Sequence, residues 1–373
     1  MPDDRHPSAD DLADLMAGAL EHGQAAAIQA HVAACAACSE VSSQLEGLPG
    51  LLAGARYPAM PEGASLRIEA ALIVAASRRA SGRDSASDRE GVVDSAAGVD
   101  PFGHLCWAYR GKADWADHAV EFSADGIAAG QCIKLIGDAS TEDLRSELAE
   151  RVRSMAEGRA ADRDLVEVRD LTDYHRFGSD GIIDTDATIA AHHAVLESAL
   201  AAGYAGIRFA VEETAIARTA AQRDAAVRME FRGGRAASSL PAGSMCGYDV
   251  DELGADAVAE LACVHPFIRR GAAPFRLYAV DDADFGLAGT IDDVTAQGLF
   301  RTTLGRTMPP EGSELVVDAR HAEFIADGAL AELNAHAARM GRTAVVHTRT
   351  STLPSPARRP ALSCLTIDTG DSP

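Results

Sequence analysis

The chain has 373 residues, of which 47% are hydrophobic and 24% are charged, a composition typical of a globular protein with two or three domains. Its formal net charge is −22, which argues against direct binding to nucleic acid and against docking on an anionic membrane. An acidic surface instead favours a basic protein partner.

The seven cysteines are scattered, apart from one close pair, and this spacing does not indicate a disulfide framework. We therefore expect a reducing, cytoplasmic environment. The acidic N-terminus lacks the apolar segment of a signal peptide, and the longest aliphatic run, near residues 70–76, is too short to span a bilayer. The sequence thus predicts a soluble protein.

Residues 1–80 predict a small bundle of three or four helices. The first begins near Ser8, the second covers about residues 24–45, and a further helix covers residues 62–77. A core of this size is marginal, and a bound metal would stabilise it.

One cluster of possible metal ligands lies in the second of these helices. His31, Cys35 and Cys38 are spaced so that they share one stripe of a helix. Two thiolates and an imidazole suit Zn²⁺, which requires a fourth ligand. His6 is the best candidate and His22 the alternative. In the simpler interpretation, the two cysteines are small core residues.

The stretch from His6 to Cys38 resembles the zinc-binding anti-sigma domain of bacterial regulators. That family clamps a sigma factor of the extracytoplasmic-function type and hides its polymerase-binding surfaces. The resemblance implies a structural zinc held by His6, His31, Cys35 and Cys38, and a sigma factor as the partner. Many relatives carry a transmembrane helix, which we do not expect here.

Residues 81–100 are rich in Ser, Gly, Arg and Asp, and predict a flexible linker.

From residue 101 to residue 270, apolar strands alternate with helical segments, which predicts a mostly parallel sheet covered on both faces. Gly137, after the second strand, is not followed by Gly-Lys-Ser/Thr. This P-loop-like domain therefore lacks a phosphate loop, and ATP hydrolysis is not expected. The strands are expected at residues 104–109, 132–136, 165–168, 207–211 and 245–248.

This domain resembles the MEDS sensory domain of methanogen and methylotroph regulators. The matching stretches are residues 104–109, 126–131 and 245–249, with His265 and Pro266 after them. In that family, an opening His-x-Cys-x-x-Tyr contributes to sensing small organic ligands. The resemblance assigns this role to His104, Cys106 and Tyr109.

Alternatives remain open for the histidines of this domain. His104 and Cys106 face the same side of their strand. They form either a ligand-sensing or metal pair, or buried strand residues with His104 bonded to a backbone carbonyl. Tyr174 and His175 lie in a loop that could line a pocket. The His192–His193 pair is expected to be structural or solvent-facing.

Residues 271–367 predict a second, small α/β domain, followed by a tail at residues 368–373. Residues 314–318 and 324–330 resemble the STAS domain of anti-sigma antagonists, which implies a regulator as a further partner. Partner-switching members carry Asp-Ser or Asp-Thr at a helix N-terminus and are phosphorylated on the hydroxyl. Here Asp327 replaces that hydroxyl, so the switch is degenerate. Asp327 either caps the helix or imitates the phosphorylated state.

The sequence therefore predicts a multidomain protein: an all-α zinc-binding unit, a Walker-less α/β domain and a STAS-like domain. The predicted function is a soluble anti-sigma-like transcription regulator that sequesters a sigma factor through its zinc-binding helices. The ligand-sensing MEDS-like domain and the STAS-like domain would modulate that binding. One alternative is a scaffold or anti-sigma antagonist in a partner-switching pathway. Another is an enzyme that uses His104, Cys106 or Cys246, although no nucleophile elbow or acid/base pair accompanies them.

Overall fold

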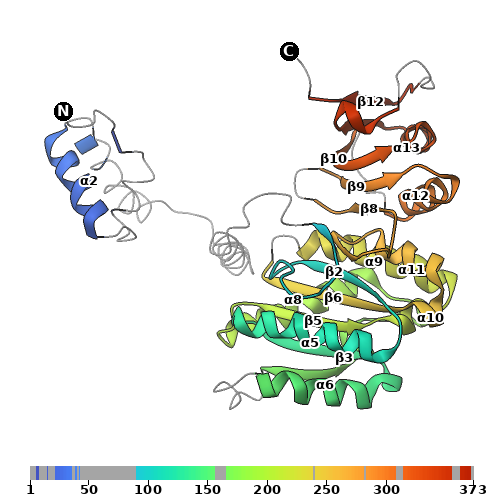
Figure 1. The fold of residues 1–373 in the computed structure, drawn as a ribbon, viewed down its shortest axis with the longest axis horizontal. Helices are drawn as coiled ribbons and strands as arrows, with labels where there is room; N and C mark the ends of the chain where they lie inside the picture. The colour runs from blue at the N-terminus through green and yellow to red at the C-terminus, as the bar shows by residue number, and fades with distance from the viewer. Residues whose placement is uncertain are drawn as a thin grey trace. The chain divides into compact units, whose positions relative to one another are not determined.

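The computed structural model describes residues 6–7, 15, 22–35, 38–39, 42, 90–155, 165–237, 240–280, 283–307, 314–354 and 362–370. The chain divides into two compact units, Met1–Ser65 and Leu66–Pro373 (Figure 1). Among the described residues, no helix combines the length and the apolar content needed to cross a bilayer.

In the first unit, α2 (His22–Ala34) is shorter than the helix expected over residues 24–45. Cys35 lies just past its end, and helical structure resumes at Cys38 and Ser39. Hydrogen bonds from the Cys35 amide to the His31 carbonyl and from the Ser39 amide to the Cys35 carbonyl continue the turn at 2.9 Å each. The single continuous helix was therefore a wrong prediction. The helix expected at residues 62–77 lies outside the described residues.

The second unit contains a seven-stranded sheet in which every described strand pair is parallel (Figure 1). The predicted strands are confirmed, with ends shifted by a few residues. Residues 132–137 and 207–212 of the central strands are nearly all buried and mostly apolar, as expected for a sheet covered on both faces. In sheet order, the strands are β1 (Gly91–Val93), β7 (Phe267–Arg269), β2 (His104–Tyr109), β6 (Ala242–Asp249), β5 (Ile207–Glu212), β3 (Cys132–Gly137) and β4 (Val166–Asp170).

Helices cover both faces of this sheet. The buried side chains of α5 and α6 share one hydrophobic cluster with one face of the strands. Those of α8, α9 and α11 share a second cluster with the other face. The helices are α5 (Lys112–Ala128), α6 (Glu142–Met155), α7 (Leu171–Tyr174), α8 (Thr185–Ala201), α9 (Ala220–Ala237), α10 (Val250–Leu253) and α11 (Ala255–Ala262), with short 3₁₀ turns η2 (Ala139–Thr141) and η3 (Thr214–Ile216).

The edge strand β1 falls inside the range predicted to be a linker. Gly91, Val92 and Val93 pair with Phe267, Ile268 and Arg269 of β7. The linker prediction therefore does not hold for residues 91–93, because two adjacent valines extend the sheet. Residues 81–89 lie outside the described part of the chain.

A second, mixed sheet of five strands follows, in which only the described pair β8–β9 is antiparallel. Strand β10 runs beyond the predicted residues 314–318, because two register shifts let it continue beside β9. The elements are β8 (Phe275–Tyr278), β9 (Phe285–Ile291), α12 (Val294–Thr307), β10 (Glu314–Ile325), α13 (Asp327–Arg339), β11 (Thr343–His347), η4 (Thr350–Thr352) and β12 (Leu365–Asp368).

The two sheet domains share one hydrophobic cluster, which runs from β6 and α9 into β9 and α12. The rings of Phe231 and Phe285 lie 5.3 Å apart. The thiol of Cys263 lies 3.2 Å from the hydroxyl of Thr303 on α12. Arg306 of α12 binds Glu260 of α11 at 2.9 Å. The two sheet domains are therefore packed into one compact unit.

The helix α13 begins at Asp327, but Asp327 does not cap it. Its N-cap residue is Ala326, and within the described chain no side chain makes a capping hydrogen bond there. The capping interpretation of Asp327 is therefore wrong, because the carboxylate sits inside the first turn. There its carboxylate lies near the positive end of the helix.

Candidate metal centre and ligand cavity

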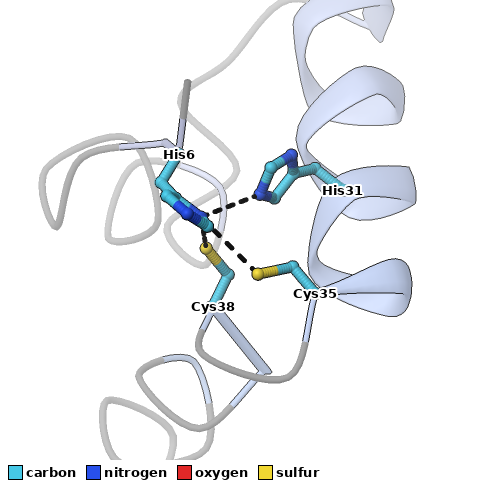
Figure 2. A group of neighbouring side chains, drawn as sticks. All are labelled: His6, His31, Cys35 and Cys38. Carbon is cyan, nitrogen blue, oxygen red and sulfur yellow. Dashed lines mark hydrogen bonds between the residues drawn. The ribbon is translucent and has the colours of Figure 1, made fainter. Parts of the chain in front are cut away.

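In the first unit, four side chains converge on one point (Figure 2). Nδ1 of His6 lies 3.3 Å from Sγ of Cys38, 3.3 Å from Nε2 of His31 and 3.5 Å from Sγ of Cys35. All four donor atoms lie within 4.8 Å of one another. His6 thus supplies the fourth donor, whereas the side chain of His22 lies outside the described residues.

These spacings fit a tetrahedral metal ion. Zinc bonds of the usual length place the ligand atoms of a tetrahedron roughly 3.3–3.8 Å apart. The interruption of the helix after Ala34 lets Cys38 turn inward, where it is buried, while His6 stays exposed. The cluster could therefore hold a metal ion, and its two thiols and two imidazoles suit zinc.

The second unit contains a cavity of about 630 Å³ between its two sheet domains. Apolar side chains such as Leu196, Phe209 and Met229 line it from the first sheet domain. Asp318 and His321 on β10 line it from the second. The cavity therefore has an apolar wall and several polar groups, as is typical of small-molecule sites.

Four titratable side chains meet at one wall of this cavity. Nε2 of His104 lies 2.9 Å from Oε2 of Glu230 and 3.5 Å from Sγ of Cys246. The same carboxylate oxygen lies 3.5 Å from Nε2 of His265 and 3.8 Å from Sγ of Cys246. The donor atoms of these four residues, here called the MEDS-domain cluster, also lie within 4.8 Å of one another.

Neighbouring elements hold this cluster in place. His104 opens β2, and Cys246 lies on the adjacent β6, where it pairs with Cys106. Glu230 comes from α9, and His265 follows α11. Glu230, Cys246 and His265 are each at most 2% exposed. The four residues thus come from four elements that only the tertiary fold brings together.

A buried hydrogen-bond chain leads away from Glu230. The Tyr248 hydroxyl lies 2.6 Å from Glu230 Oε1 and 3.1 Å from Glu213 Oε2. Burial and the nearby Glu230 raise the pKa of Glu213 well above its ordinary value. Tyr248 has a single hydroxyl hydrogen, so it donates to one of the two carboxylates at a time, and its shorter contact is with Glu230.

Burial opposes the negative charge of Glu230, but other groups outweigh it. Hydrogen bonds from His104 Nε2 and from the Tyr248 hydroxyl lower its pKa below the ordinary value. Glu230 is therefore an ionised carboxylate inside the protein, and these two donors stabilise its charge.

The three residues of the His-x-Cys-x-x-Tyr stretch do not meet at one place. His104 bonds Glu230, so the expected bond to a backbone carbonyl was wrong. Cys106 is fully buried on the same face but lies outside the cluster. Tyr109 lies at the other end of β2 and donates to Glu212 at 3.0 Å. Side chains alternate along a strand, so Tyr109 points to the opposite face.

Tyr174 and His175 occupy different environments. The Tyr174 ring stacks on His192 with ring centroids 4.0 Å apart, and both line the cavity. His175 is fully buried, and its Nε2 lies 3.3 Å from Oε1 of Glu213. Burial lowers the pKa of His192 to about 4 and that of His175 to about 3. Both are therefore neutral near pH 7, and His192 is half-buried at the cavity wall.

Sequence reasoning missed Glu230 altogether and did not connect His265 and Cys246 with His104. One signal was available: Glu230 lies between Met229 and Phe231, one turn after the buried Ala226. A carboxylate on the apolar stripe of an amphipathic helix indicates a buried polar partner.

The comparison with protein families confirms the MEDS resemblance. Residues 103–266 match the family described as the methanogen/methylotroph, DcmR sensory domain. The match includes the whole MEDS-domain cluster. No curated protein and no solved structure matches the chain significantly. A sensory domain indicates a signalling or regulatory protein.

Proposed function

We propose that this protein is an anti-sigma-type transcription regulator. Its MEDS domain binds a small organic ligand, and its N-terminal unit binds a sigma factor. The observation that carries the proposal is the cavity of about 630 Å³, one wall of which is formed by the segment that matches a sensory domain.

The cavity wall favours a particular class of ligand. Its volume is typical of small-molecule sites. Leu196, Phe209 and Met229 offer an apolar surface, and His104 and Tyr174 offer polar atoms beside it. A small organic molecule with an apolar body and one polar group would satisfy both parts.

The position of the cavity offers a way to transmit binding. A ligand there would touch the first sheet domain and also Val316, Asp318 and His321 of β10. A ligand that binds one arrangement of the two sheet domains more tightly shifts the population toward it. The second sheet domain, with its STAS-like sequence, would pass that change to the sigma-binding unit or to a further regulator.

The N-terminal unit would act by occlusion. Bound zinc would serve as a structural cross-link, because four protein ligands leave no open position for chemistry. His6, His31, Cys35 and Cys38 would hold the segments of this unit together so that they present one surface to a partner. The net charge of −22 favours a partner with a basic surface.

Pull-down with the full chain tests this proposal. We expect a sigma factor to co-purify and its transcription to be inhibited. His31→Ala should weaken both effects, and Gln29→Ala, at an exposed position of the same helix α2, should leave them unchanged. If no sigma factor is captured, or if His31→Ala inhibits transcription as well as the unchanged chain, the proposed clamp is wrong.

An enzyme is the second candidate, because a thiol, a carboxylate and imidazoles meet at the cavity wall. Burial, followed by the charges of Glu230 and Glu213, raises the pKa of Cys246 well above its ordinary value. This disfavours Cys246 as a nucleophile, which reacts as the thiolate. Turnover of a small substrate in the absence of a protein partner would favour the enzyme.

A further inference from the structure

We propose that His104, Glu230, Cys246 and His265 form a second metal site, for which zinc is the best-suited ion. The site is separate from the N-terminal cluster and lies in the other compact unit. The inference does not depend on whether the protein binds a sigma factor.

The first argument is the spacing of the donor atoms. Four distances link Nε2 of the two histidines, Oε2 of Glu230 and Sγ of Cys246, and they range from 2.9 to 3.8 Å. A tetrahedral zinc ion places its ligand atoms roughly 3.3–3.8 Å apart. Small side-chain shifts would therefore convert the cluster into a coordination shell.

The second argument is the orientation of His265. Its Nδ1 lies 2.9 Å from the Leu261 carbonyl, and a carbonyl only accepts, so Nδ1 donates. On a neutral ring, Nε2 then carries a lone pair, and it has no hydrogen-bond partner among the described residues. That lone pair faces Glu230 Oε2, which is also an acceptor, at 3.5 Å.

Two acceptors that face each other inside a protein repel unless a cation lies between them. A metal ion bound to both atoms removes this repulsion. Metal-binding histidines commonly donate their other ring nitrogen to a backbone carbonyl, which fixes the tautomer, as Leu261 does here. A proton on His265 Nε2 is the competing arrangement, and it would leave the protein without metal.

The charge of the four-residue cluster and its access from the cavity both suit a divalent cation. Glu230 and a metal-bound Cys246 thiolate carry two negative charges, which the cation would balance, and both histidines can bind as neutral rings. His104, Glu230 and Cys246 line the cavity, and His265 lies behind them. The metal would therefore enter through the cavity and form part of its wall.

Metal counting on the full chain tests the site. The double variant Cys35→Ser/Cys38→Ser removes two ligands of the N-terminal cluster. After loading with zinc and dialysis, we expect this background to retain one zinc per chain and the unchanged protein two. Adding Cys246→Ser should weaken zinc binding more than about tenfold, since it removes a direct ligand.

Cys106→Ser is the matched control, because Cys106 is buried on the same face and pairs with Cys246 but is not a donor. It should leave one zinc per chain in the same background. A background variant that has a native circular dichroism spectrum but retains no zinc would overturn the proposal.

Cobalt substitution provides a readout that does not depend on stability. Cobalt bound in the double-variant background should show a thiolate-to-metal charge-transfer band. The band should disappear in Cys246→Ser and persist in Cys106→Ser. A folded background protein that binds cobalt without this band would also overturn the proposed ligand set.

Discussion

The two His/Cys clusters of this protein resemble each other in their ligands and differ in how the chain assembles them. The N-terminal cluster uses residues 6 to 38, on a short helix and its flanks, and His6 remains exposed. The MEDS-domain cluster draws its residues from positions 104 to 265 and from four elements, and three of the four are almost fully buried. Spacing along the chain therefore reveals the first cluster, and only strand order reveals the second.

This difference has energetic consequences. Removal of a donor from the N-terminal cluster affects a small unit that a metal would hold together. Removal of a donor from the buried cluster leaves uncompensated polar groups inside the larger unit. The unit Leu66–Pro373, which holds the two sheets, is called the α/β unit below. Substitutions in the MEDS-domain cluster should therefore lower its free energy of unfolding much more than substitutions in the N-terminal cluster.

The largest expected effect is that of Glu230→Ala. The change would leave His104 and Tyr248 without their common acceptor. We expect a loss of about 3–5 kcal/mol in the free energy of unfolding of the α/β unit, measured by urea denaturation with a chelator present. Glu197→Ala, at an exposed position of α8, should change it by less than about 0.5 kcal/mol. Equal effects of the two substitutions would show that Glu230 is not a central buried acceptor.

A smaller effect on the free energy of unfolding is expected from a change in pH, because the pKa of His192 differs between the folded and the unfolded chain. Its folded pKa is lowered to about 4, so between about pH 6.5 and pH 4 the unfolded chain binds a proton that the folded chain does not. The contribution of His192 to the free energy of unfolding is therefore fully present above about pH 6.5. It decreases by about 1.4 kcal/mol per pH unit as the pH falls from about 6.5 toward about 4. His192→Phe keeps the aromatic contact with Tyr174 and should reduce the slope by that amount.

The control for this measurement is the neighbouring His193, which is exposed. His193→Gln should leave the pH dependence of the unfolding free energy unchanged. If His192→Phe and the unchanged protein lose stability with the same slope between pH 7 and pH 5, His192 titrates normally in the folded state.

The smallest expected effect on the α/β unit is that of Cys38→Ser. Cys38 belongs to the compact unit Met1–Ser65, and the MEDS-domain cluster belongs to Leu66–Pro373. We expect the N-terminal unit to lose its metal, while the urea midpoint of the α/β unit, followed by Trp107 and Trp115 fluorescence, stays the same. A large shift of that midpoint would show that the two units are energetically coupled.

Sequence patterns identified the parallel sheet and most of its strands and helices, and they favoured His6 over His22 as the partner of His31, Cys35 and Cys38. These features depend on local periodicity and on short spacings, which a linear chain displays directly. The MEDS segment was identified through its resemblance to a known family. The end of α2 at Ala34 and strand β1 were not evident, because each depends on neighbouring contacts.

Only the tertiary structure brings the four residues of the MEDS-domain cluster together. Parallel strand order places β2 beside β6, although the two strands lie more than a hundred residues apart in the chain. The packing of α9 against that face then brings Glu230 to His104, and the turn after α11 brings His265. No local pattern contains this information, because strand order and helix packing follow from the burial of the whole core.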